Sequence, residues 1–305
     1  FRVIKKNFQK KINIYGCDIR KKKSKTFLKK FILINFKSEK KFLFQILQIC
    51  KKYEIDFLFV SADKEIEILS KNLSKFKKLR TKVLINENKY SRIFNDKFKT
   101  YEILKKIGID VPKYRLFRKF SNLDKILDEF NYPSKSVIVK SRYGIGGRGV
   151  YLLVGNDKSE VKRYSWFGIN NRERKFLLLN SSIKKKIFKP QKSIIMEALT
   201  SPSYDADVLK FNNYYKTSIR KRINPAGVPY KGSKIINNKI IEKTIKKITQ
   251  RFNLKFILDF DFMTHHSSKK PLICEINTRP SGSIVDSENQ GKKIFTKLIK
   301  ILLNN

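Results

Sequence analysis

Short apolar runs alternate with longer amphipathic runs along the first hundred residues. Apolar runs of strand length lie at 12–15, 31–35, 56–60 and 83–85, and apolar residues at helical spacing fill 42–53 and 66–75. Strands that alternate with helices predict a parallel sheet of the doubly wound type. The chain opens at Phe1 in a helix-like run, whereas such a domain opens in a strand, so we expect a first strand to be missing from this sequence.

The remainder of the chain mixes strands, helices and hairpins, which predicts a second α/β unit. A helix over 97–107 ends at Gly108, and Pro112 follows, which is the usual stop signal of a helix. Further helices are predicted over 122–130, 239–252 and 292–303, and strands over 136–140, 193–197, 256–263 and 272–277. A hairpin is predicted over 206–220, and the strongly basic segment 170–192 predicts a surface loop or flap.

A glycine-rich loop follows the strand that ends at Lys140 and precedes another strand. Its glycines are Gly144, Gly146, Gly147 and Gly149. Glycines let backbone N–H groups approach an anion closely, and a lysine at the strand end adds a positive charge. The pattern differs from a P-loop, which needs Gly-Lys-Ser/Thr before a helix. It predicts a phosphate-gripping loop, with a plain hairpin turn as the alternative.

Acidic residues gather in the hairpin of strands 256–263 and 272–277. Side chains alternate along a strand, so antiparallel pairing places four polar side chains on one face: Asp259, Asp261, Glu275 and Asn277. Carboxylates this close repel one another unless a cation lies between them, and oxygen ligands suit Mg²⁺. Arg279, just past the second strand, can neutralise a developing negative charge. A solvent-facing strand pair is the alternative.

Two further groups give weaker signals. The strand 193–197 leads into Glu197, Ala198 and Leu199, a hinge that could offer backbone groups to a base, and Asp205 could accept hydrogen bonds from sugar hydroxyls. Arg220 and Arg222 lie at the end of the hairpin, where a guanidinium fork suits a phosphate or a carboxylate. Two exposed basic residues remain the alternative for the arginines. The turn that holds His265 and His266 is expected to be solvated.

Composition limits the class of protein. The chain has 305 residues, enough for two domains, and its 41% hydrophobic content excludes a disordered basic tail. No uncharged run is long enough for a transmembrane helix, and three widely spaced cysteines predict reduced thiols in a cytoplasmic protein. The net charge of +44 suggests a nucleic-acid partner or, alternatively, a codon bias that enriches Lys, Asn, Ile and Phe together. The lysines are spread along the whole chain, which favours the codon bias, so a nucleic-acid partner is not expected.

Taken in order, the glycine loop, the strand ending at Glu197 and the run Glu275-Ile276-Asn277-Thr278-Arg279-Pro280 resemble the ATP-grasp superfamily. They are similar to the carbamoyl-phosphate synthetase large subunit, biotin carboxylase and amino-acid ligases. Thr278 departs from the proline that family members usually have there. The resemblance implies an α/β fold, with a Rossmann-like pre-ATP-grasp domain over 1–95 and an ATP-grasp domain over 96–305 whose mobile lid covers about 113–198.

The resemblance also implies roles for individual residues. Lys97 and Lys140 would contact the phosphates of ATP, and the loop at Gly144, Gly146, Gly147 and Gly149 would close over them. Glu197, Ala198 and Leu199 would face adenine, and Asp205 the ribose. Asp261, Glu275 and Asn277 would hold one or two Mg²⁺ or Mn²⁺ ions. Arg279, and Arg220 from the hairpin, would act on the transferring phosphoryl group or the substrate carboxylate.

The implied activity is that of an ATP-dependent ligase, which joins a small carboxylic acid or amino acid to an amine or a thiol through an acyl phosphate. The family's carbamoyl-phosphate-forming members often have an amide where Asp261 stands, so the sequence favours a ligase. Two alternatives stay open: phosphorylation of bicarbonate, as in carbamoyl-phosphate synthetase and carboxylases, and a basic nucleic-acid-binding protein on an inactive scaffold. A homodimer also stays open.

Overall fold

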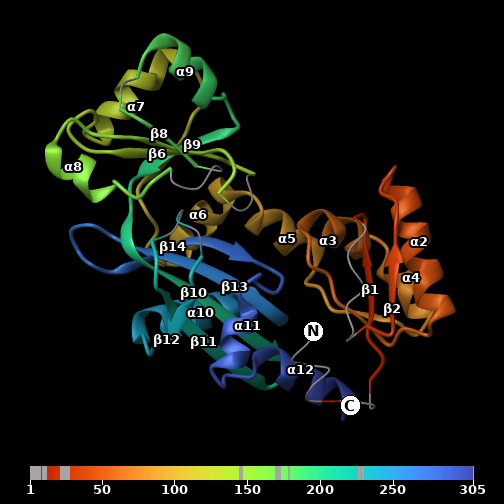
Figure 1. The fold of residues 1–305 in the computed structure, drawn as a ribbon. Helices are drawn as coiled ribbons and strands as arrows, with labels where there is room; N and C mark the ends of the chain where they lie inside the picture. The colour runs from red at the N-terminus through yellow and green to blue at the C-terminus, as the bar shows by residue number, and fades with distance from the viewer. Residues whose placement is uncertain are drawn as a thin grey trace.

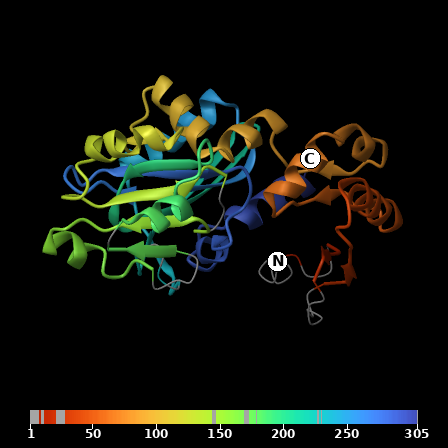
Figure 2. The ribbon, with the colours of Figure 1, turned by 90° about the horizontal axis from the view of Figure 1, so that it is seen from above.

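The computed structural model describes residues 8, 12–20, 28–143, 147–168, 173–177, 179–225, 228 and 230–304. Its mixed α/β fold contains two five-stranded sheets and two pairs of parallel strands (Figure 1). The paired strands and their helices lie to one side of the two larger sheets in both ribbon views (Figures 1 and 2). None of the described helices is both long and apolar enough to cross a membrane.

The N-terminal elements contain two separate strand pairs. Strand β1 (Tyr15–Asp18) runs parallel to β2 (Lys30–Leu33), and β3 (Phe57–Leu58) runs parallel to β4 (Lys82–Val83). The connecting helices are α2 (Glu39–Lys52), α3 (Asp63–Ser70) and α4 (Leu73–Lys78). The parallel direction predicted for these strands is therefore confirmed, but the described strands form two separate pairs instead of the single doubly wound sheet that was expected. The single helix predicted over 66–75 is wrong, because the chain turns between α3 and α4.

Helix α2 shows why this part of the chain folds as it does. Ser38 caps its N-terminus by accepting a hydrogen bond from the Lys41 backbone N–H at 3.1 Å. Phe42, Ile46 and Cys50 recur every four residues, so they form one buried stripe. This stripe packs into a cluster that includes Ile66 of α3 and Phe76 of α4. The helices therefore share one core with the parallel strands.

Two helices lead from this core to the larger sheets: α5 (Asn88–Phe94) and α6 (Lys97–Lys106). The first five-stranded sheet has the order β5-β9-β6-β7-β8. Its strands are β5 (Tyr114–Leu116), β6 (Val137–Ser141), β7 (Val150–Leu153), β8 (Glu173–Phe176) and β9 (Ser193–Glu197). The helical segments of this region are η2 (Phe120–Asn122), α7 (Leu123–Glu129), α8 (Lys158–Arg163) and α9 (Ser181–Ile187). Part of the basic segment predicted as a loop is thus regular structure, because β8 pairs with β7 and Asn180 caps α9.

The second five-stranded sheet has the order β12-β11-β10-β13-β14, and all its neighbours are antiparallel. Its strands are β10 (Thr200–Phe211), β11 (Tyr214–Arg222), β12 (Ser233–Ile235), β13 (Phe256–Thr264) and β14 (Pro271–Asn277). Helix α10 (Lys239–Arg251) buries Ile241, Ile245 and Ile248 in a cluster with residues of β10 and β13. Helices α11 (Ile284–Asn289) and α12 (Ile294–Leu303) end the chain. The predicted hairpin and strand pair are confirmed.

The packing of α10 can be tested with two substitutions on one helix. Ile245 is fully buried, whereas Ile240 is 50% exposed. Ile245→Ala should lower the free energy of unfolding by about 2–5 kcal/mol, because it removes buried methyl groups and leaves a cavity. Ile240→Ala deletes the same atoms at a solvent-exposed position, so it should change the free energy of unfolding by no more than about 0.5 kcal/mol. Urea unfolding of both variants measures the difference, and equal effects would contradict the packing described.

Candidate functional site

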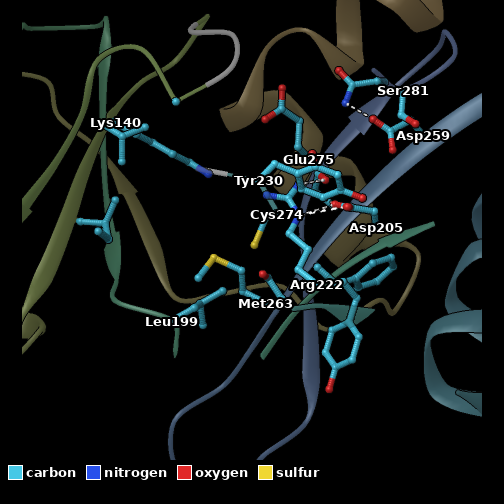
Figure 3. A pocket seen from close by; sticks show the side chains of 18 of the residues that line it. Lys140, Leu199, Asp205, Arg222, Tyr230, Asp259, Met263, Cys274, Glu275 and Ser281 are labelled. Atoms are coloured by element: carbon cyan, nitrogen blue, oxygen red, sulfur yellow. Dashed lines mark hydrogen bonds and ion pairs between the residues drawn. The ribbon is translucent and has the colours of Figure 1, made fainter. Parts of the chain in front are cut away.

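A cavity of about 890 Å³ lies between the two five-stranded sheets. Lys140 and Leu199 line it from one side, and Asp205, Asp259 and Glu275 from the other (Figure 3). Lys140 extends from its strand towards the carboxylates of the opposite sheet (Figure 3). Side chains that are more than a hundred positions apart in the sequence are thus brought to one space.

Cross-strand register arranges the acidic residues of the second sheet in two rows. The first row is Arg220, Asp205, Asp261 and Glu275, across β11, β10, β13 and β14. The second row is Ser218, Asp207, Asp259 and Asn277. Because side chains two apart share a face, both rows lie on the same face of the sheet. The predicted face of Asp259, Asp261, Glu275 and Asn277 is confirmed, and the sheet adds Asp205 and Asp207 to it.

Burial and mutual repulsion act strongly on this face. Burial raises the pKa of Asp261 well above its usual range, and the charges of Asp259 and Asp205 raise it further. Three protein cations reach the first row: Arg222 Nη2 lies 3.4 Å from Asp261 Oδ1, Lys97 Nζ lies 3.6 Å from Glu275 Oε1, and Arg220 Nη1 lies 3.9 Å from Asp205 Oδ2. The row therefore already contacts several cations of the protein, and among its carboxyl groups Asp261 carries the raised pKa.

The donor set fits a divalent cation that shares its coordination with a ligand. In the part of the chain that the structure describes, no three His, Cys, Asp or Glu side chains form a metal cage. The predicted set of Asp261, Glu275 and Asn277 has two carboxylates and one amide, all of which line the cavity. Mg²⁺ commonly takes one or two carboxylates and completes its shell with water and substrate phosphates. The chemistry of these donors therefore suits Mg²⁺ bound together with a phosphate.

Lys140 is held by a short chain of hydrogen bonds. Its Nζ donates to the Tyr101 hydroxyl at 2.7 Å, and that hydroxyl donates to the Cys274 carbonyl oxygen at 2.9 Å. Burial lowers the pKa of Lys140 to about 8, and the nearby charge of Lys97 contributes to the decrease. Tyr101 was not predicted, because a buried tyrosine on a helix gives no signal in the sequence.

Lys97 is positioned by hydrogen bonds between the start of α6 and Arg142, just past the end of β6. Asp96 caps α6 and accepts two hydrogen bonds from Arg142, from Nε and from Nη2, each 2.7 Å long. The Lys97 backbone N–H also donates to the Arg142 carbonyl oxygen at 3.0 Å. These hydrogen bonds hold Lys97 beside the strand that carries Lys140. Their partners, Asp96 and Arg142, are 46 positions apart, so sequence reasoning did not find them.

The glycine loop is described only in part. Gly144 and Gly146 lie outside the described residues, so their predicted role stays a prediction. Gly147 lines the cavity, and Gly149 has a φ of +70°, which favours glycine. A Cβ at Gly149 would lie 3.2 Å from the Cβ of Ser141, so a side chain there would be strained and crowded.

The hinge residues lie at the apolar end of the cavity. Glu197 accepts a hydrogen bond from the Lys113 backbone N–H at 2.7 Å, and its other oxygen lies 3.1 Å from His265 Nε2. His265 was expected to be solvated, and its side chain is 28% exposed; the contact with Glu197 is a partner that the sequence did not predict. The Ala198 carbonyl oxygen accepts from the Tyr164 hydroxyl at 2.7 Å, and Leu199 lines the cavity. The apolar lining that the sequence did not reveal includes Ile138, Trp166, Phe167 and Met263.

The two hairpin arginines have different surroundings from those expected. Arg222 lines the cavity and pairs with Asp205, with Nε 2.8 Å from Oδ1, so the proposed sugar ligand Asp205 already has a partner. Arg220 is fully buried and donates to Asp207 at 2.8 Å. It is absent from the cavity lining, so direct contact with a substrate is not expected of it. Asp207 also accepts from Ser281 and Ser287, which ties the segment after β14 to the sheet.

Arg279 lines the cavity as predicted, but its partner comes from the N-terminal elements. Its Nε lies 3.1 Å from Asp63 Oδ1 at the start of α3, 216 positions away. Its Nη2 also donates to Asn277 Oδ1 at 3.4 Å. The N-terminal elements therefore help to orient an arginine of the cavity, which sequence reasoning did not foresee.

The buried pair of Arg220 and Asp207 gives a test of this network. Asp207→Asn should lower the free energy of unfolding by about 3–5 kcal/mol, because it removes the closest charged partner of a buried guanidinium and leaves only Asp205, at 3.9 Å. The matched control is Asp124→Asn, whose 80% exposed carboxylate pairs with Lys184 and should contribute less than about 1 kcal/mol. Chemical denaturation measures both, and a loss below that of the control would contradict the network.

Comparison with known families identifies two parts of the chain. A model described as the RimK-like ATP-grasp domain matches residues 94–165, and a model described as the ATP-grasp in the biosynthetic pathway with Ter operon matches residues 189–305. Carbamoyl-phosphate synthase of Methanobrevibacter smithii is 24% identical over 199 residues, which are 63% of this chain and 47% of that protein. The chain thus spans about half the length of the curated relatives it matches.

Solved structures show the same fold. L-amino acid ligase of Bacillus licheniformis superposes with a TM-score of 0.62 at 12% identity, covering 94% of this chain and 66% of its own. The biotin carboxylase domain of Hydrogenobacter thermophilus 2-oxoglutarate carboxylase, solved with MgADP and bicarbonate, gives 0.65 at 15% identity, covering 100% of this chain and 67% of its own. Both matched family models and these relatives agree with the architecture described above. Residues 94–165 and 189–305 thus match ATP-grasp family models, and the fold is that of the ATP-grasp ligases named above.

Proposed function

We propose that this protein is an ATP-dependent ligase that activates a carboxylic acid as an acyl phosphate and transfers the acyl group to a nucleophile. The observation that carries the proposal is one cavity that joins three parts: the row of Asp261 and Glu275, the lysines Lys97 and Lys140, and Arg279. Two of these parts are cationic and one is anionic, which is the arrangement that a metal-bound triphosphate requires. The matches of residues 94–165 and 189–305 to ATP-grasp family models support the same activity.

Each part of the cavity has a role in the proposed reaction. The apolar end, with Leu199 and Met263, receives adenine. Lys97 and Lys140 hold the phosphates, and Asp261, Glu275 and Asn277 hold Mg²⁺ with them. The bound Mg²⁺ supplies neutralisation of phosphate charge. The substrate carboxylate oxygen attacks the γ-phosphorus, the bond to the β-phosphate oxygen breaks, and ADP leaves. The nucleophile then attacks the acyl carbon, loses its proton, and the bond to the phosphate oxygen breaks, so that inorganic phosphate leaves.

Arg279 lies beyond Asn277 and is proposed to stabilise the charge on the phosphoryl group and on the acyl phosphate. Positioning and charge neutralisation supply most of the rate enhancement in such a transfer. We further propose that residues 113–198, with the glycine loop, form a lid that excludes water from the acyl phosphate. The first five-stranded sheet faces the sheet that carries the carboxylates, and the two share one cavity. This arrangement supports the proposal of a lid.

We also propose that residues 1–95 form a Rossmann-like domain and residues 96–305 the ATP-grasp domain. The two parallel strand pairs and their connecting helices support the first assignment. A second cavity of about 840 Å³ is lined by residues of β1, β3 and the segment that follows Arg279. The contact of Asp63 with Arg279 gives this domain a part in the site.

The proposed role of Glu275 can be tested by substitution. ADP release should be measured with ATP, Mg²⁺, and pools of small carboxylic acids, amino acids and amines. Glu275→Gln should lower ADP release at least about a hundredfold, because it removes a ligand charge while keeping the shape of the side chain. The matched control is Glu242→Gln. Glu242 is exposed on α10, so this variant should keep full activity. Equal ADP release by Glu275→Gln and the parent protein would refute the proposed site.

The lowered pKa of Lys140 gives a prediction for pH. The side chain is charged below about pH 8 and neutral above it, so nucleotide affinity should decrease as pH rises through this value. A bound phosphate favours the charged form and moves the decrease to somewhat higher pH. Titration of ADP binding from about pH 7 to about pH 10 should show a loss of about tenfold or more. Lys140→Met should bind ADP more weakly and without this pH dependence; an unchanged pH profile would argue against contact with phosphate.

A further inference from the structure

We propose that the carboxylic acid activated by this ligase carries an uncharged, apolar side chain, which packs against Val228, Tyr230 and Val285. These three residues line the end of the first cavity that lies away from Leu199 and Met263, called the far end below. The inference rests on the proposed function and names the chemical class of its first substrate. It is carried by the position of these side chains, by their exposure, and by the small number of charges near them.

The far end is built by the chain that follows β14. Leu199 and Met263 lie at the end proposed for adenine. Met263 and Asp259 are four residues apart on β13, which at about 3.4 Å per residue separates them by about 14 Å. Asp207 lies opposite Asp259 on the neighbouring strand and accepts a hydrogen bond from Ser281 at 2.7 Å. The segment after β14 is therefore held over the row of Asp259, away from the adenine end.

Hydrogen bonds bring Tyr230 to the same place. Its hydroxyl donates to the carboxylate of Asp286, lies 2.9 Å from Ser233 Oγ, and accepts from Arg220 Nη1 at 3.4 Å. Val285 directly precedes Asp286 on α11, and both Val285 and Tyr230 line the cavity. The contact with Asp286 therefore brings the tyrosine ring and the valine side chain to one part of the wall.

The surface that these side chains offer is apolar and open. Tyr230 is 46% exposed and Val285 is 45% exposed, although both line a cavity. The tyrosine hydroxyl is engaged by the protein, so the ring is the part of this side chain that is left for a ligand. Val228 adds a third apolar side chain to the wall. Exposed apolar side chains that gather at a cavity wall favour an apolar ligand group.

Charge in this part of the wall is limited to one cation. Of the cavity-lining residues described between β11 and β12 and after β14, Arg279 alone is charged. Asp286 is outside the lining, and its carboxylate accepts hydrogen bonds from Tyr230 and from Ser233 Oγ. Arg279 suits the carboxylate of the acid and the acyl phosphate formed from it. A second charge on the acid would lie beside apolar side chains without a partner, which is unfavourable, so an uncharged side chain is expected.

The far end also has room for a side chain of several carbon atoms. Gly282 lines the cavity, and a Cβ at this position would meet no atom within 4 Å apart from its chain neighbours. Arg279, Gly282 and Val285 line the second cavity as well as the first, so the two cavities adjoin at these residues. An acid whose carboxylate contacts Arg279 can therefore extend an apolar group past Gly282 and along Val285.

The first experiment compares acids that differ only in the side chain, with ATP, Mg²⁺ and hydroxylamine. The hydroxylamine nitrogen attacks the acyl carbon and loses a proton, and inorganic phosphate leaves, so the hydroxamate reports the acyl phosphate. One series is acetate, isovalerate and succinate, and the other is glycine, leucine and aspartate, which shows whether the acid carries an amino group. In the series that reacts, the apolar acid should exceed the other two at least about tenfold in kcat/KM. A preference for succinate or aspartate, or equal values within the series, would overturn the proposal.

The second experiment changes the surface itself. Val285→Thr keeps the shape of the side chain but replaces a methyl group with a hydroxyl group. It should lower kcat/KM about fourfold or more for isovalerate or leucine, mainly through KM, and leave acetate or glycine within about twofold. The matched control is Val161→Thr on α8, where the valine is 43% exposed, and it should change neither. An equal loss with both acids, or no loss with the apolar acid, would overturn the role of Val285.

The third experiment needs no turnover. With MgADP present, isovalerate should raise the melting temperature above that in acetate of equal concentration, or leucine above that in glycine, and Val285→Thr should reduce the difference. If no acid gives ADP or hydroxamate but this difference is present and reduced in the variant, the proposed ligase function fails while the acid site stands. If an acid reacts but neither apolar acid raises the melting temperature, the ligase function stands and the inference about its substrate is overturned.

Discussion

Charge compensation on one face of the second sheet is the constraint on which the rest of the site depends. Three strands bring five carboxylates into two adjacent rows: Asp205, Asp207, Asp259, Asp261 and Glu275. Burial raises the pKa of Asp259 and Asp261 well above the usual range of a carboxyl group, and the neighbouring carboxylates add to that effect. Such a face is stable only where cations reach it, so the positions of the cations determine how the sheet contacts its surroundings.

The compensating cations come from different parts of the chain. Arg220 and Arg222 come from β11, Lys97 from the start of α6, and Arg279 from the segment after β14. Arg279 in turn contacts Asp63 of the N-terminal elements. Interactions that lower the electrostatic cost of one sheet therefore also connect it to α6 and α3. This explains how the N-terminal elements, which share no sheet with the site, still contribute to its geometry.

The sequence was sufficient for the parts of the site that depend on local periodicity. Alternation along the strands placed Asp259, Asp261, Glu275 and Asn277 on one face, and the structure confirms it. The match holds because the β-bulge of this strand pair lies between Asp261 and Phe262, past the acidic residues. The pairs that position the cations could not be predicted in the same way, because Asp96 with Arg142 and Asp63 with Arg279 are joined only by tertiary folding. The sequence left open whether the hairpin arginines bind a ligand or are exposed, and the partner strand separates them: Arg220 is fully buried, whereas Arg222, two residues further, lines the cavity.

The chain has a net charge of +44, but basic and acidic residues are balanced around the cavity. Its walls and the network behind them combine six acidic residues, the five named above and Glu197, with six basic residues: Lys97, Lys140, Arg148, Arg220, Arg222 and Arg279. The site is thus close to neutral, and a bound nucleoside triphosphate would make it strongly negative. A divalent cation would restore the balance, and the partly unsatisfied carboxylates of β13 and β14 are the groups able to hold it. The surplus of lysines elsewhere on the chain is therefore a separate property from the chemistry of the cavity, and the scarce acidic residues carry more of the information about function.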